Sequence, residues 1–128
     1  MLDTGFMLVY VDDPAKSAGF YARLLDRPSK IGSPNFASIS LASGFTLAFW
    51  SKQVASPKPD FSGSSGELLL FVDTPDDLER VHVRWRDEER IPILQAPTDL
   101  VFGRTFVASD PDGHRVRVIA PNETGRGR

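Results

Sequence analysis

The stretch Phe106-Val-Ala-Ser-Asp-Pro-Asp-Gly-His-Arg-Val-Arg-Val-Ile119 predicts two strands joined by a tight turn. Pro111 fixes φ at the first central position of that turn, and Gly113 supplies the permissive backbone at which the chain reverses. Side chains alternate in the second strand, with Arg115, Arg117 and Ile119 on one side and Val116 and Val118 on the other. Because successive strand residues point to opposite faces, we expect one apolar face and one face that carries two guanidinium groups.

A strand followed by a capped helix is predicted twice along the chain. Val11-Asp-Asp-Pro14 and Val72-Asp-Thr-Pro75 each end an apolar strand and begin a helix, because Asp and Thr are favourable N-caps and Pro suits the first helical position. The first half is expected to hold strands at 6–11, 36–41 and 45–50 and a helix at about 15–26, with a weaker signal for an edge strand near Lys30. The second half begins with a strand at 67–72 and a helix at 76–89.

Two offsets indicate an internal repeat. A shift of 61 residues places Val11–Pro14 on Val72–Pro75, and a shift of 69 places Gly44 on Gly113, so the second half has eight extra residues, expected within 95–104. A strand-helix-strand-strand unit used twice indicates one repeated architecture. We therefore expect one domain at 1–121, with module one at 4–52, a flexible linker at 53–66 and module two at 67–121, followed by a flexible tail at 122–128.

Composition narrows the class of protein. The 128 residues, 41% of them hydrophobic, suffice for one folded domain, and the net charge of -2 argues against nucleic-acid binding. There is no cysteine, which excludes disulfides, thiolate metal sites and a cysteine nucleophile. We see no signal peptide and no apolar run near the roughly 18 residues that a membrane span needs, so a cytoplasmic location is the expectation.

Two β-α-β-β-β units with an Asp110-Pro-Asp-Gly113 turn before the last strand resemble the vicinal oxygen chelate superfamily, which includes glyoxalase I, extradiol dioxygenases and bleomycin-resistance proteins. The resemblance covers about Thr4 to Pro121. The two segments most specific to the family are Ser17–Tyr21, which looks like its first helix, and Ser109–Val118. It implies an α+β fold in which two tandem βαβββ modules form a curved sheet, with helices on the outer face and a concave ligand cavity. It also implies a homodimer with cavities formed between chains.

The resemblance places the metal ligands of the family's enzymes at Phe6, Ala48, Glu67 and Arg117. Phe and Ala have no lone pair to offer, and Arg stays protonated, so Glu67 alone remains. The two histidines, His82 on a helix and His114 at the turn, are expected at the surface or at a rim. We therefore expect no metal and no other cofactor.

Strand alternation assigns the residues of the predicted strands to two opposite faces of the sheet. Apolar residues occupy one side throughout and are expected to form the core under the helices: Met7, Val9, Val11, Phe45, Leu47, Phe49, Leu68, Leu70, Val72, Val116 and Val118. The other side mixes aromatic and polar residues, as a small-molecule cavity does. The alternative is that a neighbouring module covers this second face.

Nine residues are candidates for ligand binding: Tyr10, Phe36, Ser38, Ser40, Thr46, Trp50, Glu67, Phe102 and Arg117. Trp50 ends a strand on the cavity side and suits stacking on a planar aromatic, although it would equally cap the edge of the core. Glu67 and Arg117 are expected to form an ion pair; the alternative is that one of them grips a polar group of the ligand. Phe102 lies in a predicted loop at 97–104 that covers the opening, with Gly103 as its flexible point.

These features favour a protein that binds and sequesters a planar aromatic antibiotic, such as a phenazine-like or bleomycin-like compound, without a metal and without catalysis. Glu67 would be a weak general base because a neighbouring Arg lowers its pKa. Two alternatives remain at this stage: a lyase, isomerase or dioxygenase with an atypical site, and a scaffold without a physiological ligand.

Overall fold

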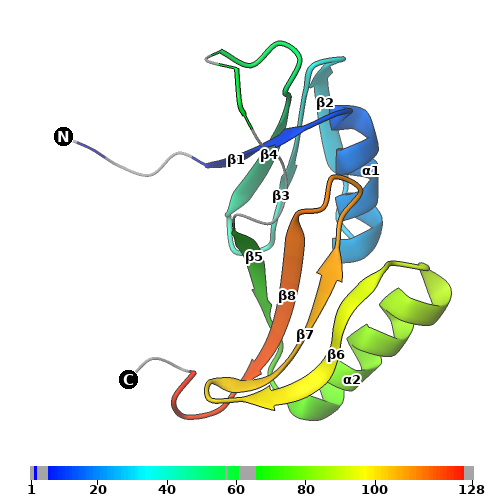
Figure 1. The fold of residues 1–128 in the computed structure, drawn as a ribbon, viewed down its shortest axis with the longest axis vertical. Helices are drawn as coiled ribbons and strands as arrows, with labels where there is room; N and C mark the ends of the chain where they lie inside the picture. The colour runs from blue at the N-terminus through cyan, green and yellow to red at the C-terminus, as the bar shows by residue number, and fades with distance from the viewer. Residues whose placement is uncertain (1, 3–5, 57, 61–65, 126–128) are drawn as a thin grey trace. The chain divides into compact units, whose positions relative to one another are not determined.

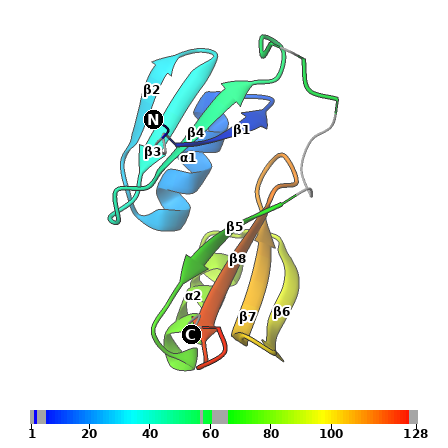
Figure 2. The same cartoon turned by 90° about the vertical axis from the view of Figure 1, so that its left-hand side faces the viewer.

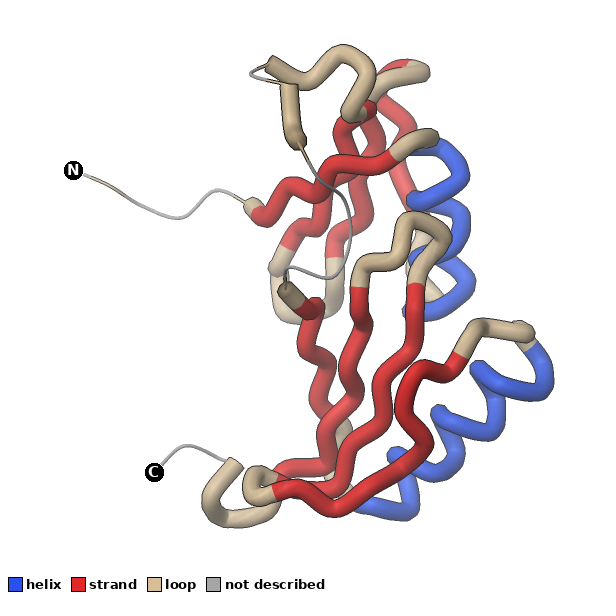
Figure 3. Tube along the Cα trace, in the orientation of Figure 1, coloured by secondary structure: helices blue, strands red, loops and turns tan. Residues whose placement is uncertain are grey.

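The computed structural model describes residues 2, 6–56, 58–60 and 66–125. The chain divides into two compact units, Met1–Ser62 and Gly63–Arg128, and each is described by itself (Figure 1). Both units contain a four-stranded sheet with a helix on one face, as the two cartoon views and the Cα trace show (Figures 2 and 3). The predicted α+β class and the two βαβββ modules are confirmed.

Unit one runs β1 (Met7–Val11), α1 (Pro14–Leu25), β2 (Ser29–Ser33), β3 (Phe36–Ser40) and β4 (Thr46–Ser51), with the sheet order β1-β4-β3-β2. Unit two runs β5 (Glu67–Phe71), α2 (Pro75–Val83), the π-helical turn η1 (Arg84–Glu88), β6 (Ile93–Leu100), β7 (Gly103–Ser109) and β8 (Arg115–Pro121), in the order β5-β8-β7-β6. The edge strand expected near Lys30 is β2.

Strand register confirms the repeat. β1 pairs in parallel with β4 so that Met7 lies opposite Leu47, and β5 pairs in parallel with β8 so that Leu68 lies opposite Val116. These two pairs are related by the two offsets read from the sequence. Each module therefore places its first and last strands side by side in the same register.

The helix starts follow the predicted capping chemistry. The Asp13 carboxylate accepts a hydrogen bond from the Lys16 N–H at 3.3 Å, and the Thr74 hydroxyl accepts one from the Asp77 N–H at 3.1 Å. A proline follows each cap. These caps satisfy amide groups that the first helical turn leaves without partners.

The predicted loop at 97–104 is wrong. β6 continues to Leu100 and β7 starts at Gly103, so the two strands form a hairpin whose turn is Val101 and Phe102. The extra residues of module two mostly lengthen this hairpin: β6 and β7 have 8 and 7 residues, where β2 and β3 have 5 each. Gly103 is not a flexible point. Its φ is 141°, and a Cβ at this position would collide with the Ala120 carbonyl, so close packing of β7 on β8 requires glycine.

Asp110 organises the turn that precedes β8. Its carboxylate accepts hydrogen bonds from the N–H groups of Asp112 at 2.9 Å and His114 at 2.8 Å, and its carbonyl accepts one from Gly113 at 3.1 Å. Gly113 has φ 84°, the left-handed conformation that the turn was predicted to need. The turn therefore starts β8 at Arg115 and sets which of its side chains face the helix.

Each core lies between a sheet and its helix. In unit one Tyr21 of α1 stacks on Phe49 of β4 with 5.2 Å between ring centroids. In unit two Trp85 packs edge-on against Phe106 of β7 at 5.4 Å. Most of the predicted core residues are buried or half-buried, but Met7, the first residue of β1, and Phe45, which immediately precedes β4, are 56% and 42% exposed.

His82 lies in this core, which corrects the expectation that it is a surface residue. It is buried on α2, and its ring contacts Phe106 at 5.1 Å between centroids. Burial lowers the pKa of its imidazole, and the nearby Arg86 guanidinium lowers it further.

Protonation of His82 should therefore destabilise the fold. The unfolded imidazole takes up a proton near its ordinary pKa of about 6.5, whereas the folded imidazole does so only at lower pH. We expect the melting temperature to fall as pH drops from neutral through that value, and the loss to level off below the folded pKa. The control is a His82→Gln variant, which has no imidazole to protonate. If the melting temperatures of the wild type and of this variant fall by the same amount between neutral and mildly acidic pH, protonation of His82 is not the cause of the loss.

The segments expected to be flexible are only partly described. Residues 53–55 continue from β4 in a turn in which Ala55 donates its N–H to the Ser51 carbonyl at 3.0 Å, while most of the Ser62–Gly66 stretch lies outside the described residues. At the other end Asn122 donates its N–H to the Phe102 carbonyl at 3.1 Å, which ties residues 122–125 to the β6–β7 turn. Residues 126–128 lie outside the described part. None of the described helices has the length and apolar composition of a membrane span.

Candidate functional site

The sheet face opposite α1 carries a row of three aromatic residues. Trp50 on β4 lies opposite Tyr10 on β1 and Phe36 on β3, so the row crosses three strands. The Tyr10 and Trp50 rings are 6.5 Å apart with a 35° tilt, and all three side chains are half-buried. Phe6 extends the apolar surface, with its ring 6.5 Å from that of Phe36. This aromatic row offers flat apolar area on a face that the helix leaves open.

The predicted polar residues of unit one lie on the same face. Ser38 lies opposite Ala48, and Ser40 lies opposite Thr46, with 3.3 Å between the two hydroxyl oxygens. The structure thus places all six predicted site residues of unit one on one face, as strand alternation required. Strand alternation predicts Phe6 on this face as well; it is not one of the nine candidates, and its contact with Phe36 adds it to this surface.

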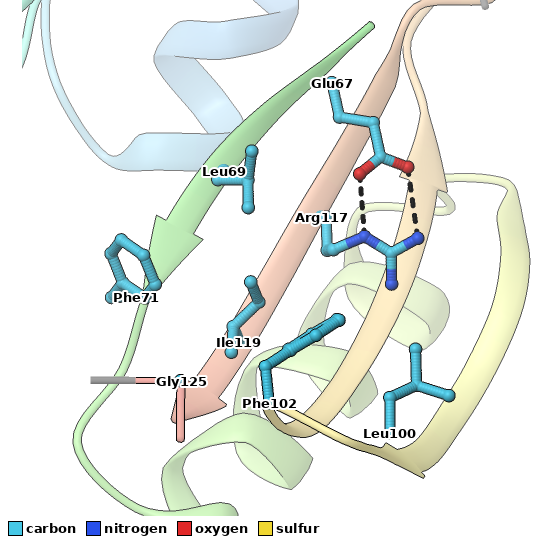
Figure 4. A pocket seen from close by; sticks show the side chains of 8 residues that line it. All are labelled: Glu67, Leu69, Phe71, Leu100, Phe102, Arg117, Ile119 and Gly125. Atoms are coloured by element: carbon cyan, nitrogen blue, oxygen red, sulfur yellow. Dashed lines mark hydrogen bonds and ion pairs between the residues drawn. The ribbon is translucent and has the colours of Figure 1, made fainter. Parts of the chain in front are cut away.

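Unit two holds a pocket of about 380 Å³ on the face of its sheet opposite α2 (Figure 4). Its lining is mainly apolar, and one ion pair lies at one end (Figure 4). The lining residues are Glu67, Leu69, Phe71, Leu100, Phe102, Arg117, Ile119 and Gly125. Three predicted site residues, Glu67, Phe102 and Arg117, are among them. Leu100 was missed because β6 was read as a loop, and no pattern in the sequence indicated Gly125.

The predicted ion pair between Glu67 and Arg117 is confirmed and is bidentate. Arg117 donates from Nε to one carboxylate oxygen at 2.7 Å and from Nη2 to the other at 3.1 Å. The two residues are diagonal neighbours on β5 and β8, because Glu67 lies opposite Arg115 and Leu69 lies opposite Arg117. The side chains of Arg117 and Glu67 are only 15% and 23% exposed, so water screens the pair less than it screens a surface ion pair.

Further contacts hold the Arg117 guanidinium in place. Its Nη1 donates to the Thr105 hydroxyl at 3.3 Å, and that hydroxyl donates to the Val118 carbonyl at 2.8 Å. The guanidinium also lies over the Phe102 ring, 6.0 Å from its centroid. The hydrogen bonds from Arg117 lower the pKa of the Glu67 carboxyl. Glu67 is therefore ionised at neutral pH and is a weak proton acceptor.

The four positions that correspond to metal ligands do not fit a divalent cation. Strand register places Ala48 and Arg117 at equivalent positions of β4 and β8, and Phe6 and Glu67 precede the equivalent residues Met7 and Leu68. Only Glu67 among them offers a donor atom, and Arg117 engages both of its oxygens. The described ranges contain no cluster of three or more His, Cys, Asp or Glu residues suited to a metal ion.

Residues 4–118 match the model of the Glyoxalase/Bleomycin resistance protein/Dioxygenase superfamily. The chain belongs to this superfamily. A phenazine antibiotic resistance protein, EhpR of Enterobacter agglomerans, is 30% identical to this superfamily member over 115 residues, which cover 87% of this chain and 86% of EhpR.

Solved structures share the fold. A solution NMR structure from Agrobacterium tumefaciens has 35% identity, covers 95% of this chain and 99% of its own, and gives a TM-score of 0.82. A glyoxalase/bleomycin resistance protein/dioxygenase from Nocardioides has 21% identity and a TM-score of 0.79, with 98% and 88% of the two chains covered. At 21% identity the Nocardioides protein is evidence for the fold alone.

Proposed function

We propose that this protein binds a planar aromatic antibiotic and holds it unchanged, without a metal. The observation that carries the proposal is the aromatic row formed by Tyr10, Trp50 and Phe36 on the open face of sheet one. Aromatic side chains stack on planar rings and lose little conformational entropy when they do so. The similarity to a phenazine resistance protein supports a tricyclic aromatic of that kind as the ligand.

The Ser38, Ser40 and Thr46 hydroxyls lie on the same face as the aromatic row and would orient a ligand that stacks there. In unit two, the Arg117 and Glu67 side chains are the charged groups of that unit's own pocket. Few polar groups among apolar walls are typical of small-molecule sites. None of them forms a nucleophile–base pair, and Arg117 keeps Glu67 a poor base, which supports binding over catalysis.

Resistance by sequestration follows mass action. Each protein molecule removes one drug molecule from solution, so affinity and protein concentration determine protection, and turnover contributes nothing.

We also propose that the protein acts as a homodimer whose copies complete the cavities, since Phe6 and Phe71 leave 56% and 64% of their surface exposed. Sedimentation of a monomer at the concentration at which ligand binds would contradict the dimer.

Tryptophan fluorescence titrated with phenazine tests the proposed function. We expect saturable quenching at about one ligand per chain in protein whose metal content, measured on the same sample, is negligible. A flat titration together with stoichiometric Zn²⁺, Ni²⁺, Mn²⁺ or Fe²⁺ would contradict sequestration and would point to a metal-dependent enzyme.

A further inference from the structure

We propose that residues 122–125, which follow β8, form a latch on the β6–β7 turn, and that this latch controls entry to the pocket of unit two. The latch is closed in the structure and keeps the Phe102 ring beside the Arg117 guanidinium. Latch and pocket both lie within unit two, and neither involves the aromatic row of unit one. The residue that holds the latch closed is Asn122, which was not a predicted site residue.

Asn122 binds the β6–β7 turn through both its main chain and its side chain. Its backbone N–H donates to the Phe102 carbonyl at 3.1 Å, and its side-chain Nδ2 donates to the Val101 carbonyl at 3.2 Å. Its Oδ1 accepts a hydrogen bond from the Gly125 N–H at 2.9 Å. One residue therefore holds both residues of the β6–β7 turn and also closes 122–125 into a turn of its own.

Gly125 lets the latch lie directly against the β6–β7 turn. A Cβ at this position would collide with the Phe102 carbonyl and would crowd the Pro121 side chain, so the close approach requires glycine. Gly125 and Phe102 are both part of the pocket lining (Figure 4). The latch is thus itself a piece of the pocket wall, and it fixes the backbone of the residue that carries the neighbouring ring.

The latch is the part of this region that can open most easily. Asn122 is exposed and Val101 is 78% exposed, so water competes for the hydrogen bonds between them. Such solvent-exposed contacts open locally at a lower free energy than the sheet does. The strands below are held more firmly, because Gly103 at the start of β7 packs on the Ala120 carbonyl of β8. Opening would therefore move residues 101–102 and 122–125 and leave the sheet intact.

Opening of the latch would uncover the charged end of the pocket. The Phe102 ring centroid lies 6.0 Å from the Arg117 guanidinium, and the side chains of Arg117 and Glu67 are only 15% and 23% exposed. Once the backbone of Phe102 is released, its ring is no longer held in this position, and water or a small apolar molecule gains access from the side of the turn. Loops that open and close over a pocket in this way control the rates of entry and release.

Hydrogen exchange of the Arg117 Nε–H, followed by NMR in the full chain, tests the latch with water as the probe. Asn122→Ala removes the side-chain hydrogen bonds, and Gly125→Ala displaces the latch by collision while it keeps them. We expect each variant to raise the exchange rate of the Arg117 Nε–H at least about 10-fold. Thr124→Ala changes an exposed residue of the same turn and is the control; it should leave the rate within about 2-fold.

The backbone N–H groups of Phe106 and Val118, buried residues that lie opposite each other on β7 and β8, report on the rest of the sheet. The latch predicts that their exchange stays within about 2-fold of the wild type in both variants. Unchanged exchange of the Arg117 Nε–H in both variants would overturn the proposal. Equal acceleration of the Phe106 and Val118 N–H groups would also overturn it, because residues 122–125 would then support the whole sheet and would not act as a latch.

Discussion

Trp50→Ala should weaken phenazine binding by roughly 10- to 100-fold, because stacking on an aromatic side chain contributes about 1–3 kcal/mol per ring system. Trp50 lies at the centre of the aromatic row, opposite Tyr10 and Phe36, so its loss removes the middle ring of the row. Calorimetry measures the effect without depending on the fluorescence of the residue that is removed.

Two further variants make the result specific. Trp50→Phe keeps a flat ring and should lose less than about 5-fold in affinity. Phe45→Ala removes an exposed aromatic ring just outside β4 and should leave affinity unchanged. Equal affinity of Trp50→Ala and the wild type would show that the aromatic row does not bind the ligand.

Phe106→Ala should lower the free energy of unfolding of unit two by about 3–5 kcal/mol, the usual cost of removing a fully buried aromatic ring. Phe106 is 0% exposed and contacts the rings of both His82 and Trp85, at 5.1 Å and 5.4 Å between centroids. The rings of His82 and Trp85, which contact Phe106, are rigid and would not fill the space that its ring leaves. Most of the cavity should therefore remain.

Urea denaturation followed by circular dichroism measures this loss. Phe71→Ala is a suitable comparison on the same sheet, since Phe71 is 64% exposed and its removal should cost less than about 1 kcal/mol. A loss below about 1.5 kcal/mol for Phe106→Ala would contradict the description of the core.

Strand alternation and capping residues were sufficient to predict the architecture. Two offsets between equivalent segments correctly related β1 and β4 to β5 and β8, and the cap-then-proline segments correctly located both helices. These features are local, and local backbone preferences decide them.

The features that were missed depend on contacts between distant segments. The sequence predicts a loop at 97–104 because the extra residues of module two are expected there, with Gly103 as its flexible point. In the structure these residues form the β6–β7 hairpin, and glycine is required at position 103 by the close approach of the Ala120 carbonyl. His82 was expected at the surface or at a rim because it lies on a helix outside the sheet, but its ring contacts that of Phe106 on β7. The pairing of Glu67 with Arg117, by contrast, was predictable from strand order.

Recovery of the ligand after incubation tests the central claim, sequestration without conversion, most directly. Protein and phenazine are mixed at equal concentration, the complex is isolated by gel filtration, and the extracted ligand is analysed by chromatography and mass spectrometry. We predict about one ligand per chain, recovered chemically unchanged after many hours. A ligand that is consumed or converted to a product would contradict the account and would show that the protein is an enzyme.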